Sequence, residues 1–362
     1  MSDAPLRVLL VYSRVGGGHL SAARALAEAF EAEGHTTRLV DVYLECGRFP
    51  VTLFPRAYAE MARHHPRLWA MLFHGSNRGL DPKRVLGPFL RTGLRGLMQE
   101  ERPDLVISVL PMVNGLLAEV CDTTEVVLTD WHSVHRFWVA KGVGHYTAPT
   151  PSARQDCVRF GAPADAVDIV GIPVRRAFAD AAQQEPTKHE QFTVLMMVGA
   201  EGSPRALDNL RGLAQLDLDA QIVVVCGRNE ELRQQVESLP TRLRVQALGF
   251  VEDIATLMRS ADILVTKAGG LTLAEAFCCS VPVVVYDVLP GQEAGNLDYA
   301  LSQGAVVHST SPRHLVGIVR DLHADATRRS ALAASGRRQA CPHAATQIAA
   351  NILERKSGAP RA

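Results

Sequence analysis

The chain has 362 residues, of which 47% are hydrophobic and 21% charged, a composition and length that suit a globular protein of two domains. Because 38 basic residues balance 38 acidic ones, the net charge excludes a general attraction to nucleic acid or anionic membrane, and any such targeting must come from a local patch. The seven cysteines form no CxxC pair, which indicates structural thiols in a reducing compartment. No apolar run approaches the roughly 20 residues that span a bilayer. We therefore expect a cytoplasmic protein that contacts the inner face of the cell membrane only peripherally.

The first half of the chain reads as an alternation of strands and helices. Residues 6–12 (LRVLLVY) form an apolar strand, a glycine cluster follows, and residues 21–32 (SAARALAEAFEA) are strong helix formers. A strand pattern resumes at residues 37–42, so this βαβ unit predicts a parallel sheet. Further strands are predicted at residues 105–110, 125–129, 144–148 and 167–170. Together they predict an α/β domain over residues 1–176.

A polar stretch at residues 177–191 reads as a linker, and a second α/β series follows it. Its predicted strands are residues 193–198, 221–226, 245–247, 263–266, 281–286 and 305–307, with helices at 205–213, 230–238 and 271–278. This predicts a second domain over residues 192–340, then a C-terminal helix and tail over 341–362. Two successive α/β halves predict two facing doubly wound domains, with the ligand site in the cleft beyond the carboxyl ends of their strands.

The strongest local signal is the segment VTKAGGLTLAEA in the second half, a strand followed by a glycine turn and a helix. Thr272 or the preceding glycines can cap this helix, whose N–H groups and positive dipole end suit a phosphate. Lys267 adds a positive charge, and Gly269 and Gly270 allow close approach of the backbone. Glu275 lies one turn into the helix, where its carboxylate can accept hydrogen bonds from a ribose. The alternative is a plain strand–helix turn with a surface glutamate.

Other turns of the same half add to this signal. The next strand runs into DVLPGQEAGN, in which Gln292, Glu293 and Asn296 can read sugar hydroxyls. Two more turns, at residues 199–203 (GAEGS) and 227–229, each follow a predicted strand. Because all of them fall at the expected ligand edge of one sheet, the set is more specific than any member.

At this point the sequence resembles a known family. KAGGLTLAEA followed by PGQEAGN is similar to the donor-binding region of the MurG-like glycosyltransferases of family 28, and closest to monogalactosyldiacylglycerol synthase and the processive diacylglycerol glucosyltransferases. VGGGHLSAARAL resembles the glycine-rich loop of that branch, and TDWHSVHRFW resembles its pairing of Thr-Asp with a later His and Trp. The resemblance covers residues 7–350. It implies a GT-B fold of two Rossmann-like domains and transfer of a hexose from a UDP-sugar with inversion, forming a β-glycoside.

The resemblance also implies roles for individual residues of the second half. The diphosphate would be lined by Lys267, Gly269, Gly270 and Thr272, with Gly199 facing it from the other side; Glu275 would hold the ribose, Gln292 and Glu293 the hexose with Asn296 nearby, and Phe250 would pack beside the uracil. Where the family often has a glycine-richer turn, this chain has Ala200 and Glu201. The phosphate contacts at that turn therefore stay open.

His19, just beyond the loop formed by Gly16, Gly17 and Gly18, is our candidate for the base. Glycosyl transfer needs a group that takes the proton of the acceptor hydroxyl, and an imidazole that titrates near neutrality suits this task. Asp130, at the end of an apolar strand, is either the rival base or the orienting partner of His19. The alternatives are a packed or helix-capping histidine and an aspartate that caps a helix. His132 and His135 are further, weaker candidates.

We expect no metal or other cofactor, with the UDP-sugar acting as a substrate. No DxD motif stands in a suitable place, and the histidines lack clustered ligand spacing. The charge of the leaving group can instead be met by Lys267, backbone N–H groups and the helix dipole.

The segment 49–98 resembles a Rossmann half least and is our candidate for the acceptor and membrane surface. It combines aromatic residues with cations; counting Arg48 just before it, nine Lys and Arg stand against two acids, a formal charge of +7. Its aromatic residues are Phe49, Phe54, Tyr58, Trp69, Phe73 and Phe89, its cations Arg48, Arg56, Arg63, Arg67, Arg78, Lys83, Arg84, Arg91 and Arg95, and its acids Glu60 and Asp81. This mixture is typical of segments that lie on an anionic bilayer. The alternative is a set of core-facing helices with solvated arginines, and no motif supports nucleic acid as a partner.

The leading hypothesis is a glycosyltransferase that moves a hexose from UDP to a membrane lipid of the diacylglycerol type. The alternatives are a polyprenyl-linked or soluble acceptor, a non-catalytic protein that binds nucleotide sugars, and an epimerase of the UDP-N-acetylglucosamine 2-epimerase type. The Gln292–Glu293 pair does not distinguish glucose from galactose, because both sugars would meet the same side chains.

Overall fold

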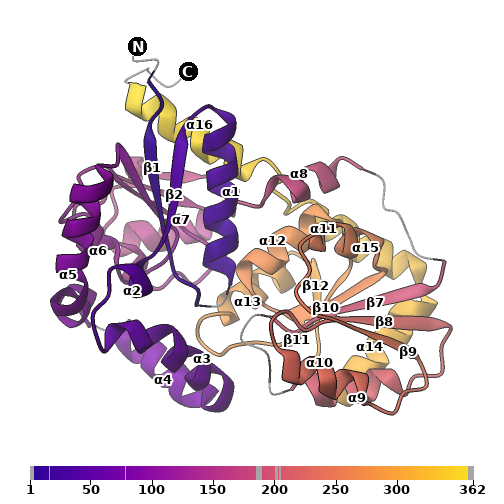
Figure 1. The fold of residues 1–362 in the computed structure, drawn as a ribbon. Coiled ribbons are helices and arrows are strands. Elements are labelled where there is room, and N and C mark those ends of the chain that lie inside the picture. Colours follow the sequence, from indigo (N-terminus) through magenta and orange to yellow (C-terminus); the bar gives the residue numbers. More distant parts are fainter. Residues whose placement is uncertain are drawn as a thin grey trace. The chain divides into compact units, whose positions relative to one another are not determined.

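The computed structural model describes residues 4–15, 17–77, 79–184, 190–199, 203 and 205–357. The chain divides into two compact units, the first comprising Met1–Glu60, Leu68–Arg176 and Cys341–Ala362, and the second Met61–Arg67 and Ala177–Ala340. Each unit contains a six-stranded sheet in which all paired strands are parallel (Figure 1). The predicted α/β class, with a parallel sheet in each half, is confirmed.

The sheet of the first unit has the strand order β2-β1-β3-β4-β5-β6. Its strands are β1 (Arg7–Tyr12), β2 (Thr36–Asp41), β3 (Leu105–Ser108), β4 (Thr124–Val127), β5 (His145–Ala148) and β6 (Val167–Ile169). The helices along this part of the chain are α1 (Gly18–Ala32), α2 (Val42–Glu45), η1 (Val51–Leu53), α3 (Phe54–His64), α4 (Pro66–Ser76), α5 (Pro82–Glu101), α6 (Asn114–Leu117), η2 (Arg136–Trp138), α7 (Pro151–Arg159), η3 (Ala164–Ala166) and α8 (Arg176–Ala182), and α16 (Ala344–Ser357) returns to the unit at the C-terminus.

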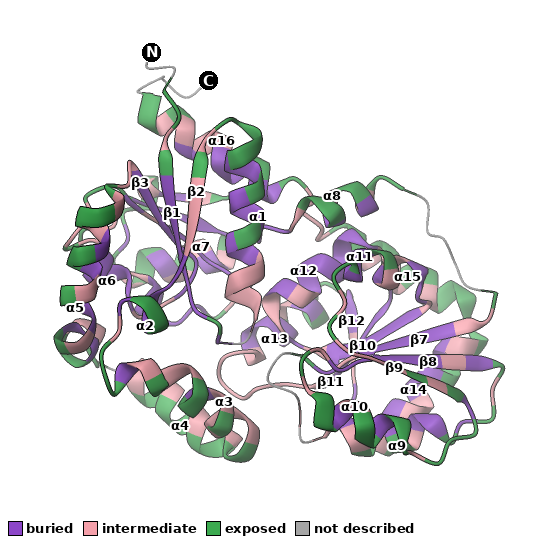
Figure 2. Cartoon of the chain, in the orientation of Figure 1, coloured by how far each residue is buried: buried purple, intermediate pink, exposed green. Residues whose placement is uncertain are grey.

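Alternating side chains of β1 supply the two cores of the first sheet. Val8 and Leu10 join a cluster with helices α1 and α16, whereas Leu9 and Val11 join another with α2, α5 and α6. All four side chains are at most 2% exposed, and Figure 2 shows the buried strands between their more exposed helices. A strand buried on both faces reads as a continuous apolar run, which explains the sequence LRVLLVY.

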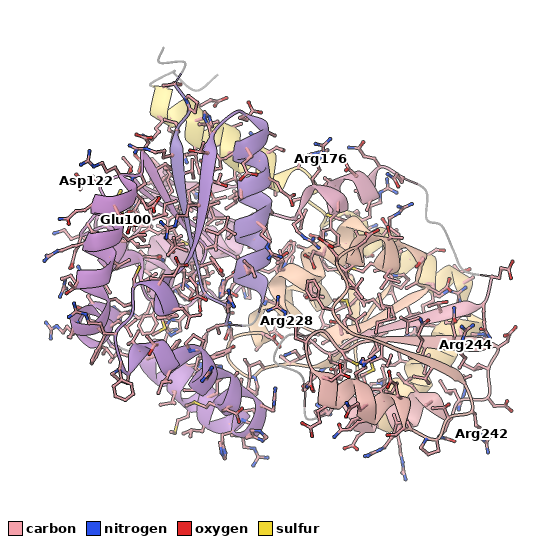
Figure 3. The ribbon with its side chains drawn as sticks, in the orientation of Figure 1. Glu100, Asp122, Arg176, Arg228, Arg242 and Arg244 are labelled. Carbon is pink, nitrogen blue, oxygen red and sulfur yellow. The ribbon has the colours of Figure 1, made fainter. Side chains whose placement is uncertain are left out.

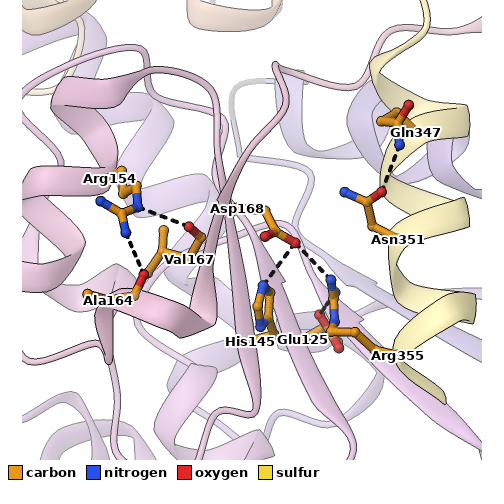
Figure 4. A network of polar contacts seen from close by, with 9 residues as sticks. All are labelled: Glu125, His145, Arg154, Ala164, Val167, Asp168, Gln347, Asn351 and Arg355. Carbon is orange, nitrogen blue, oxygen red and sulfur yellow. Dashed lines mark hydrogen bonds and ion pairs between the residues drawn. The ribbon is translucent and has the colours of Figure 1, made fainter. Parts of the chain in front are cut away.

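A largely buried polar network connects α16 to the first sheet (Figure 4). Arg355 donates hydrogen bonds of 2.8 Å to Asp168 on β6 and to Glu125 on β4, and His145 Nε2 on β5 lies 3.0 Å from the same Asp168 oxygen. Burial raises the pKa of Glu125, and Arg355 acts against this shift. These residues stand near the amino ends of their strands, opposite the edge at which a parallel sheet binds ligands, so we assign the network a structural role.

The sheet of the second unit has the order β12-β11-β10-β7-β8-β9. Its strands are β7 (Phe192–Met197), β8 (Ala220–Val225), β9 (Arg244–Leu248), β10 (Ile263–Lys267), β11 (Val283–Asp287) and β12 (Val306–His308), and its helices are α9 (Ala206–Ala214), α10 (Glu230–Glu237), α11 (Ile254–Ser260), α12 (Gly270–Cys278), α13 (Ala294–Ser302), α14 (Pro312–Ala324) and α15 (Ala326–Arg337). One core of this sheet lies under α9, α10 and α14. On α15, a Cβ at Gly336 would lie 2.9 Å from the ring of Phe277, so α15 packs closely on α12.

Each of the twelve predicted strands overlaps an observed strand, with ends displaced by one or two residues. Helix α1 starts at Gly18, earlier than the predicted residue 21, because Gly17 caps it in the left-handed conformation with φ 71°. Part of the predicted linker is helical, since α8 ends at Ala182, and residues 185–189 lie outside the described residues. The segment 49–98 forms the helices η1, α3, α4 and most of α5.

Candidate active site

In the first sheet, β2 lies on one side of β1, and β3 and the strands after it lie on the other side. The strand order therefore reverses between β1 and β3, and a doubly wound sheet binds its ligands at such a switch point. The glycine-rich loop follows β1 there. Gly17 and Gly18 form the N-cap and the first residue of α1, whereas Gly16 lies outside the described residues. His19 is therefore in the first turn of α1, directly at the switch point.

His19 is held across the switch point by one hydrogen bond. Its Nδ1 lies 2.6 Å from the carbonyl oxygen of Val109, the residue that follows β3. Because a carbonyl only accepts, Nδ1 must carry the proton, and in the neutral ring Nε2 is left with a lone pair. Burial lowers the pKa of His19 to about 4, against the opposing effect of this hydrogen bond. The imidazole is therefore neutral near pH 7 and has its accepting nitrogen fixed. Contrary to the expectation from the sequence, it does not titrate near neutrality, because burial disfavours the charged ring.

Asp130 follows β4 and has Trp138 as a hydrogen-bond donor. The indole Nε1 of Trp138 donates to Asp130 Oδ2 at 2.8 Å. The same indole ring, fully buried, lies with its centroid 6.3 Å from that of His19. The structure thus brings His19, Trp138 and Asp130 together at one edge of the sheet. Sequence reasoning chose His19 and Asp130 but gave Trp138 no role, although TDWHSVHRFW contains it.

The loop that carries Asp130 is fixed by contacts along its length. Asn114 donates to the carbonyl oxygen of Trp138 at 2.9 Å, and Thr150 donates to that of Trp131 at 2.6 Å. The two weaker histidine candidates are also engaged here: His132 Nδ1 lies 2.9 Å from Ser152 Oγ, and His135 is buried against α4. Such a loop presents Asp130 in a defined orientation.

The switch point of the second sheet lies between β7 and β10, and it brings Gly199 and Lys267 together. A Cβ added to Gly199 would lie only 2.8 Å from Lys267 Cε, so the lysine side chain crosses directly over the glycine. Gly199 has φ +75°, a conformation that favours glycine. Two predicted donor residues from different strands thus meet. Ala200 and Glu201, in the turn that follows, lie outside the described residues.

Helix α12 begins at this edge with the predicted glycine turn. Gly269 is its N-cap, Gly270 its first residue and Thr272 lies in its first turn. The N-cap residue Gly269 has no side chain to cap α12, and the first turn of the helix has no acidic residue. Glu275, the predicted ribose ligand, is 7% exposed. An N-terminus of this kind suits an anion, since its N–H groups and dipole are both directed at the ligand.

The loop between β11 and α13 contributes the remaining predicted residues. Glu293 is the N-cap of α13 and accepts a hydrogen bond of 2.7 Å from the Leu289 N–H, and its Oε1 lies near Gly269. Gln292 is half-buried in the turn just before it. Asn296 is buried and donates to the Ala268 carbonyl oxygen at 3.2 Å, which ties α13 to the glycine turn. Glu293 thus stands beside the α12 N-terminus.

Phe250 follows β9 and is 63% exposed, with the guanidinium of Arg228 5.5 Å from the centre of its ring. Arg228 (labelled in Figure 3) follows the neighbouring strand β8. Sequence reasoning noted the turn at residues 227–229 but gave the arginine no role. A second set that it missed is Asp287 at the end of β11, which accepts from Ser203 Oγ at 2.5 Å and lies 3.7 Å from Arg205.

The segment 49–98 contains two kinds of helix. Helix α5 faces a core with Leu86, Leu90, Leu94 and Leu97, as the alternative of core-facing helices expected. Helix α4, in contrast, has no buried residue. Exposed large apolar side chains gather in this part of the chain: Phe49, Leu53, Leu68, Met71, Leu72, Leu80 and Val85.

The cations of the segment are not all available to a partner. Lys83 and Arg91 both pair with Glu119 at 3.0 Å, so the formal charge of +7 overstates the local field. Arg56 and Arg67 are exposed, and Arg78 lies outside the described residues. The cationic surface is therefore best represented by α3 and the start of α4.

Two kinds of feature are absent from the residues that the structure describes. No group of three or more His, Cys, Asp or Glu side chains is arranged there to hold a metal ion. Among the helices described, none has both the length and the apolar composition needed to cross a membrane.

Two family models match the chain. Residues 19–174 match the model of monogalactosyldiacylglycerol (MGDG) synthase, and residues 179–339 match glycosyl transferases group 1. The chain is 31% identical over 350 residues to a probable monogalactosyldiacylglycerol synthase, chloroplastic, from Glycine max, covering 88% of this chain and 65% of that protein. It is 30% identical over 344 residues to monogalactosyldiacylglycerol synthase 3, chloroplastic, from Arabidopsis thaliana, covering 87% of this chain and 73% of that protein. The chain thus spans about two thirds of the length of these relatives.

A solved structure agrees with the fold. MurG from Acinetobacter baumannii matches with a TM-score of 0.63 at 16% identity, covering 97% of this chain and 100% of that one. At this identity the likeness concerns the fold alone, which is GT-B. Sequence relatives and family model agree on the rest: the chain belongs to the monogalactosyldiacylglycerol synthase family of glycosyltransferases.

Proposed function

We propose that the chain transfers galactose from UDP-galactose to diacylglycerol at a membrane surface. The observation that carries this proposal is His19: its Nδ1 is committed to the Val109 carbonyl, so its Nε2 is an acceptor at the ligand-binding edge of the first sheet. A neutral imidazole whose lone pair has a fixed orientation can accept the proton of an acceptor hydroxyl. We take the sugar and the lipid from the relatives, which are monogalactosyldiacylglycerol synthases by name.

The proposed reaction is a single displacement. His19 Nε2 accepts the proton of the diacylglycerol hydroxyl as its oxygen forms a bond to C1 of galactose, while the bond between C1 and the β-phosphate oxygen breaks and UDP leaves. The attack inverts C1 and yields a β-galactoside. Asp130, oriented by the indole of Trp138, supplies a negative charge that stabilises the imidazolium as it forms.

The carboxyl edge of the second sheet is the proposed donor site. Lys267 and the N-terminus of α12 would stabilise the charge that grows on the leaving diphosphate, with Gly199 allowing its close approach. Gly270 and Thr272 would add donors from the first turn, Glu275 would hold the ribose and Phe250 the uracil, and Gln292 and Glu293 would bind the hexose. Asn296 would support the site indirectly, because its amide donates to the Ala268 carbonyl oxygen and fixes the turn there. We propose that this charge stabilisation operates without a metal ion.

The acceptor would be reached from the membrane through α3 and α4. Leu68, Met71 and Leu72 of α4 are exposed large apolar side chains, and Arg56 and Arg67 stand exposed in the same helices. Apolar side chains that enter the interface and cations that meet anionic headgroups are the two components of peripheral binding. We propose that the protein lies on an anionic cytoplasmic surface and has no nucleic-acid partner.

The reaction is tested by supplying radiolabelled UDP-galactose, and in parallel UDP-glucose, to purified protein with diacylglycerol in anionic vesicles and EDTA. We expect galactose label in an organic-phase glycolipid. Preferential labelling from UDP-glucose would contradict the sugar, and a requirement for divalent cation would contradict the metal-free site. UDP release without labelled lipid would favour a soluble acceptor, and no turnover would favour a nucleotide-sugar-binding protein. A polyprenyl phosphate in place of diacylglycerol tests the remaining acceptor class.

The membrane surface is tested separately by vesicle sedimentation. Replacing Arg56 and Arg67 by Gln should weaken binding to anionic vesicles and leave binding to neutral vesicles unchanged. A matched control replaces Lys83 and Arg91 by Gln, because Glu119 already pairs with both. If the two double variants weakened binding equally, general charge and not α3 and α4 would account for it.

A further inference from the structure

His135 connects the loop that carries Asp130 to the last turn of α4. Its Nε2 lies 3.1 Å from the Phe73 carbonyl oxygen and 3.1 Å from Ser76 Oγ, and its Nδ1 accepts the Phe137 N–H at 3.2 Å. Since a backbone N–H only donates, Nδ1 must be unprotonated, and the neutral ring therefore carries its proton on Nε2 and donates to α4. The ring is 5% exposed, and burial lowers its pKa to about 4, which keeps it neutral.

Two more contacts join the same partners. Asn77 Oδ1, just after α4, accepts the Arg136 N–H at 3.0 Å. The His135 ring packs between Phe73 and Phe137, with centroid distances of 4.7 Å and 4.3 Å. We call His135 and Asn77 together the α4 latch.

Few other described contacts fix α4. None of its residues is buried, and its apolar side chains Leu68, Met71 and Leu72 remain 43%, 63% and 45% exposed. The edge-on contact of Trp69 with Tyr58, at 4.8 Å, ties α4 to α3, which itself buries only Tyr58. The position of α4 on the first unit therefore depends strongly on the latch.

The loop that carries His135 also carries residues of the candidate active site. His135 is the N-cap of η2, and its carbonyl oxygen accepts the Trp138 N–H at 3.1 Å. One tight turn thus separates the ring bound to α4 from the indole that donates to Asp130 at 2.8 Å. A displacement of α4 would move η2, and with it the hydrogen bond that orients Asp130.

We propose that His135 is a positioning residue that couples the seating of α4 on a lipid surface to the orientation of Asp130, so that transfer is fast only when α4 is engaged. This inference rests on the function proposed above. Helix α4, with exposed apolar side chains and the exposed Arg67 near its start, is the element that a bilayer would hold. Its occupant in this proposal is the anionic membrane surface that contains the acceptor.

The test compares transfer to membrane-bound and to dispersed acceptor. Transfer is measured to long-chain diacylglycerol in anionic vesicles and to dispersed short-chain diacylglycerol without vesicles. The readout is the ratio of the rate with vesicles to the rate without them. The variant His135→Phe keeps a ring but loses all three polar contacts of the imidazole, whereas in His135→Gln the amide NH₂ can replace the Nε2–H donor. We expect the ratio to fall at least about tenfold in His135→Phe and to recover largely in His135→Gln, with the dissociation constant for UDP unchanged within about twofold.

The matched control is His132→Phe, because His132 lies in the same loop but contacts Ser152 on α7. This substitution should leave the ratio unchanged, whatever it does to the rates. Asn77→Ala removes only the contact with the Arg136 N–H and replaces His135→Phe if that variant fails to fold; its ratio should fall as well.

An unchanged ratio in His135→Phe would overturn the proposal, whether both rates fall equally or neither falls. Equal loss of both rates would mean that His135 is merely structural, because such a residue would not distinguish the two acceptors. Absence of transfer by the unmodified protein to either acceptor would overturn the proposed function first, and that result is visible before any variant is made.

Discussion

The two units use the same location for different chemistry. In both, the candidate residues lie across the switch point of a six-stranded parallel sheet: His19 contacts Val109 between β1 and β3, and Lys267 crosses Gly199 between β7 and β10. The second unit has glycines, a cation and a helix N-terminus there, which suit an anion that is already charged when it binds. The first unit has a neutral, half-buried imidazole beside an indole that donates to a carboxylate.

This difference follows from what each site must do. A diphosphate is bound by backbone N–H groups that come close to its oxygens, so such a site has glycines where a side chain would block the ligand. A base must be uncharged before the reaction and oriented during it, so one ring nitrogen has a fixed partner and the other is left to accept the proton. We therefore expect changes in the first unit to alter the rate of transfer and changes in the second to alter donor affinity.

The largest expected effect comes from His19→Gln. The amide can still donate to the Val109 carbonyl, but no nitrogen is left to accept a proton, so kcat for transfer should fall by about 10²- to 10⁴-fold. UDP affinity, measured by calorimetry, should stay unchanged. His35→Gln is the matched control, because His35 accepts a backbone hydrogen bond from Leu6 beside the start of β1, away from the switch point. Full transfer by His19→Gln would remove His19 as the base.

The pH dependence of transfer sharpens the assignment. Because burial lowers the pKa of His19 to about 4 from its ordinary 6.5, kcat/KM should fall on acidification with a midpoint near 4. UDP affinity should show no such fall on acidification. Between pH 6.5 and 4 the unfolded chain binds a proton that the folded site refuses, so the contribution of His19 to the free energy of unfolding is complete above pH 6.5 and lost progressively below it. A kinetic midpoint near 6.5, or one that persists in His19→Gln, would contradict the assignment.

Trp138→Phe tests whether the indole orients Asp130. The substitution removes the N–H that donates at 2.8 Å, and a hydrogen bond to a charged group contributes about 1.5–3 kcal/mol, so transfer should fall at least about tenfold. UDP affinity should not change. The specific check is a double-mutant cycle with Asp130→Asn, in which the losses should be strongly non-additive. Additive losses would mean that the carboxylate acts independently of Trp138.

The local geometry of the glycine turns in the second unit was easier to predict from the sequence than the surroundings of His19 in the first. A strand, a glycine turn and a helix are contiguous in the chain, so the positions of Gly199, Lys267 and Gly269 at one sheet edge follow from local sequence, while their contacts with a donor stay a prediction. The parallel order of strands then follows from the alternation of elements, as do the two sheets. For this reason all twelve strands were located, with errors confined to their ends.

The features that could not be predicted from the sequence depend on contacts between distant segments. The Val109 carbonyl that fixes the tautomer of His19 lies 90 positions away from it, and no side-chain pattern marks a carbonyl. Glu119 neutralises Lys83 and Arg91 from outside the segment whose charge was counted. The role of His135 was invisible for the same reason, because its partners Phe73 and Ser76 lie 62 and 59 positions away.

A smaller effect is expected from Gly199→Ala in the second unit. Its Cβ would lie 2.8 Å from Lys267 Cε and must displace the lysine, so UDP affinity should fall by about five- to tenfold, near 1 kcal/mol. Gly304→Ala is the control, because Gly304 has φ +61° but no atom closer than 3.9 Å to the added Cβ. Both variants carry the cost of a left-handed residue, about 1–2 kcal/mol of stability. If both lost UDP affinity equally, backbone strain and not Lys267 would be the cause.

The smallest effect concerns Arg228, whose guanidinium lies 5.5 Å from the ring centre of the exposed Phe250. If this pair holds the uracil, Arg228→Gln should weaken UDP binding by about two- to fivefold, because an exposed cation–π contact contributes about 0.5–1 kcal/mol. Arg329→Gln is the matched control: Arg329 stacks on Phe192 at 5.1 Å, at the amino end of β7. That variant should lower stability, since Arg329 also donates to the His323 carbonyl, but not UDP affinity. Loss of UDP affinity in Arg329→Gln alone would place the nucleobase away from Phe250 and would remove the carboxyl edge of β8 and β9 from the donor site.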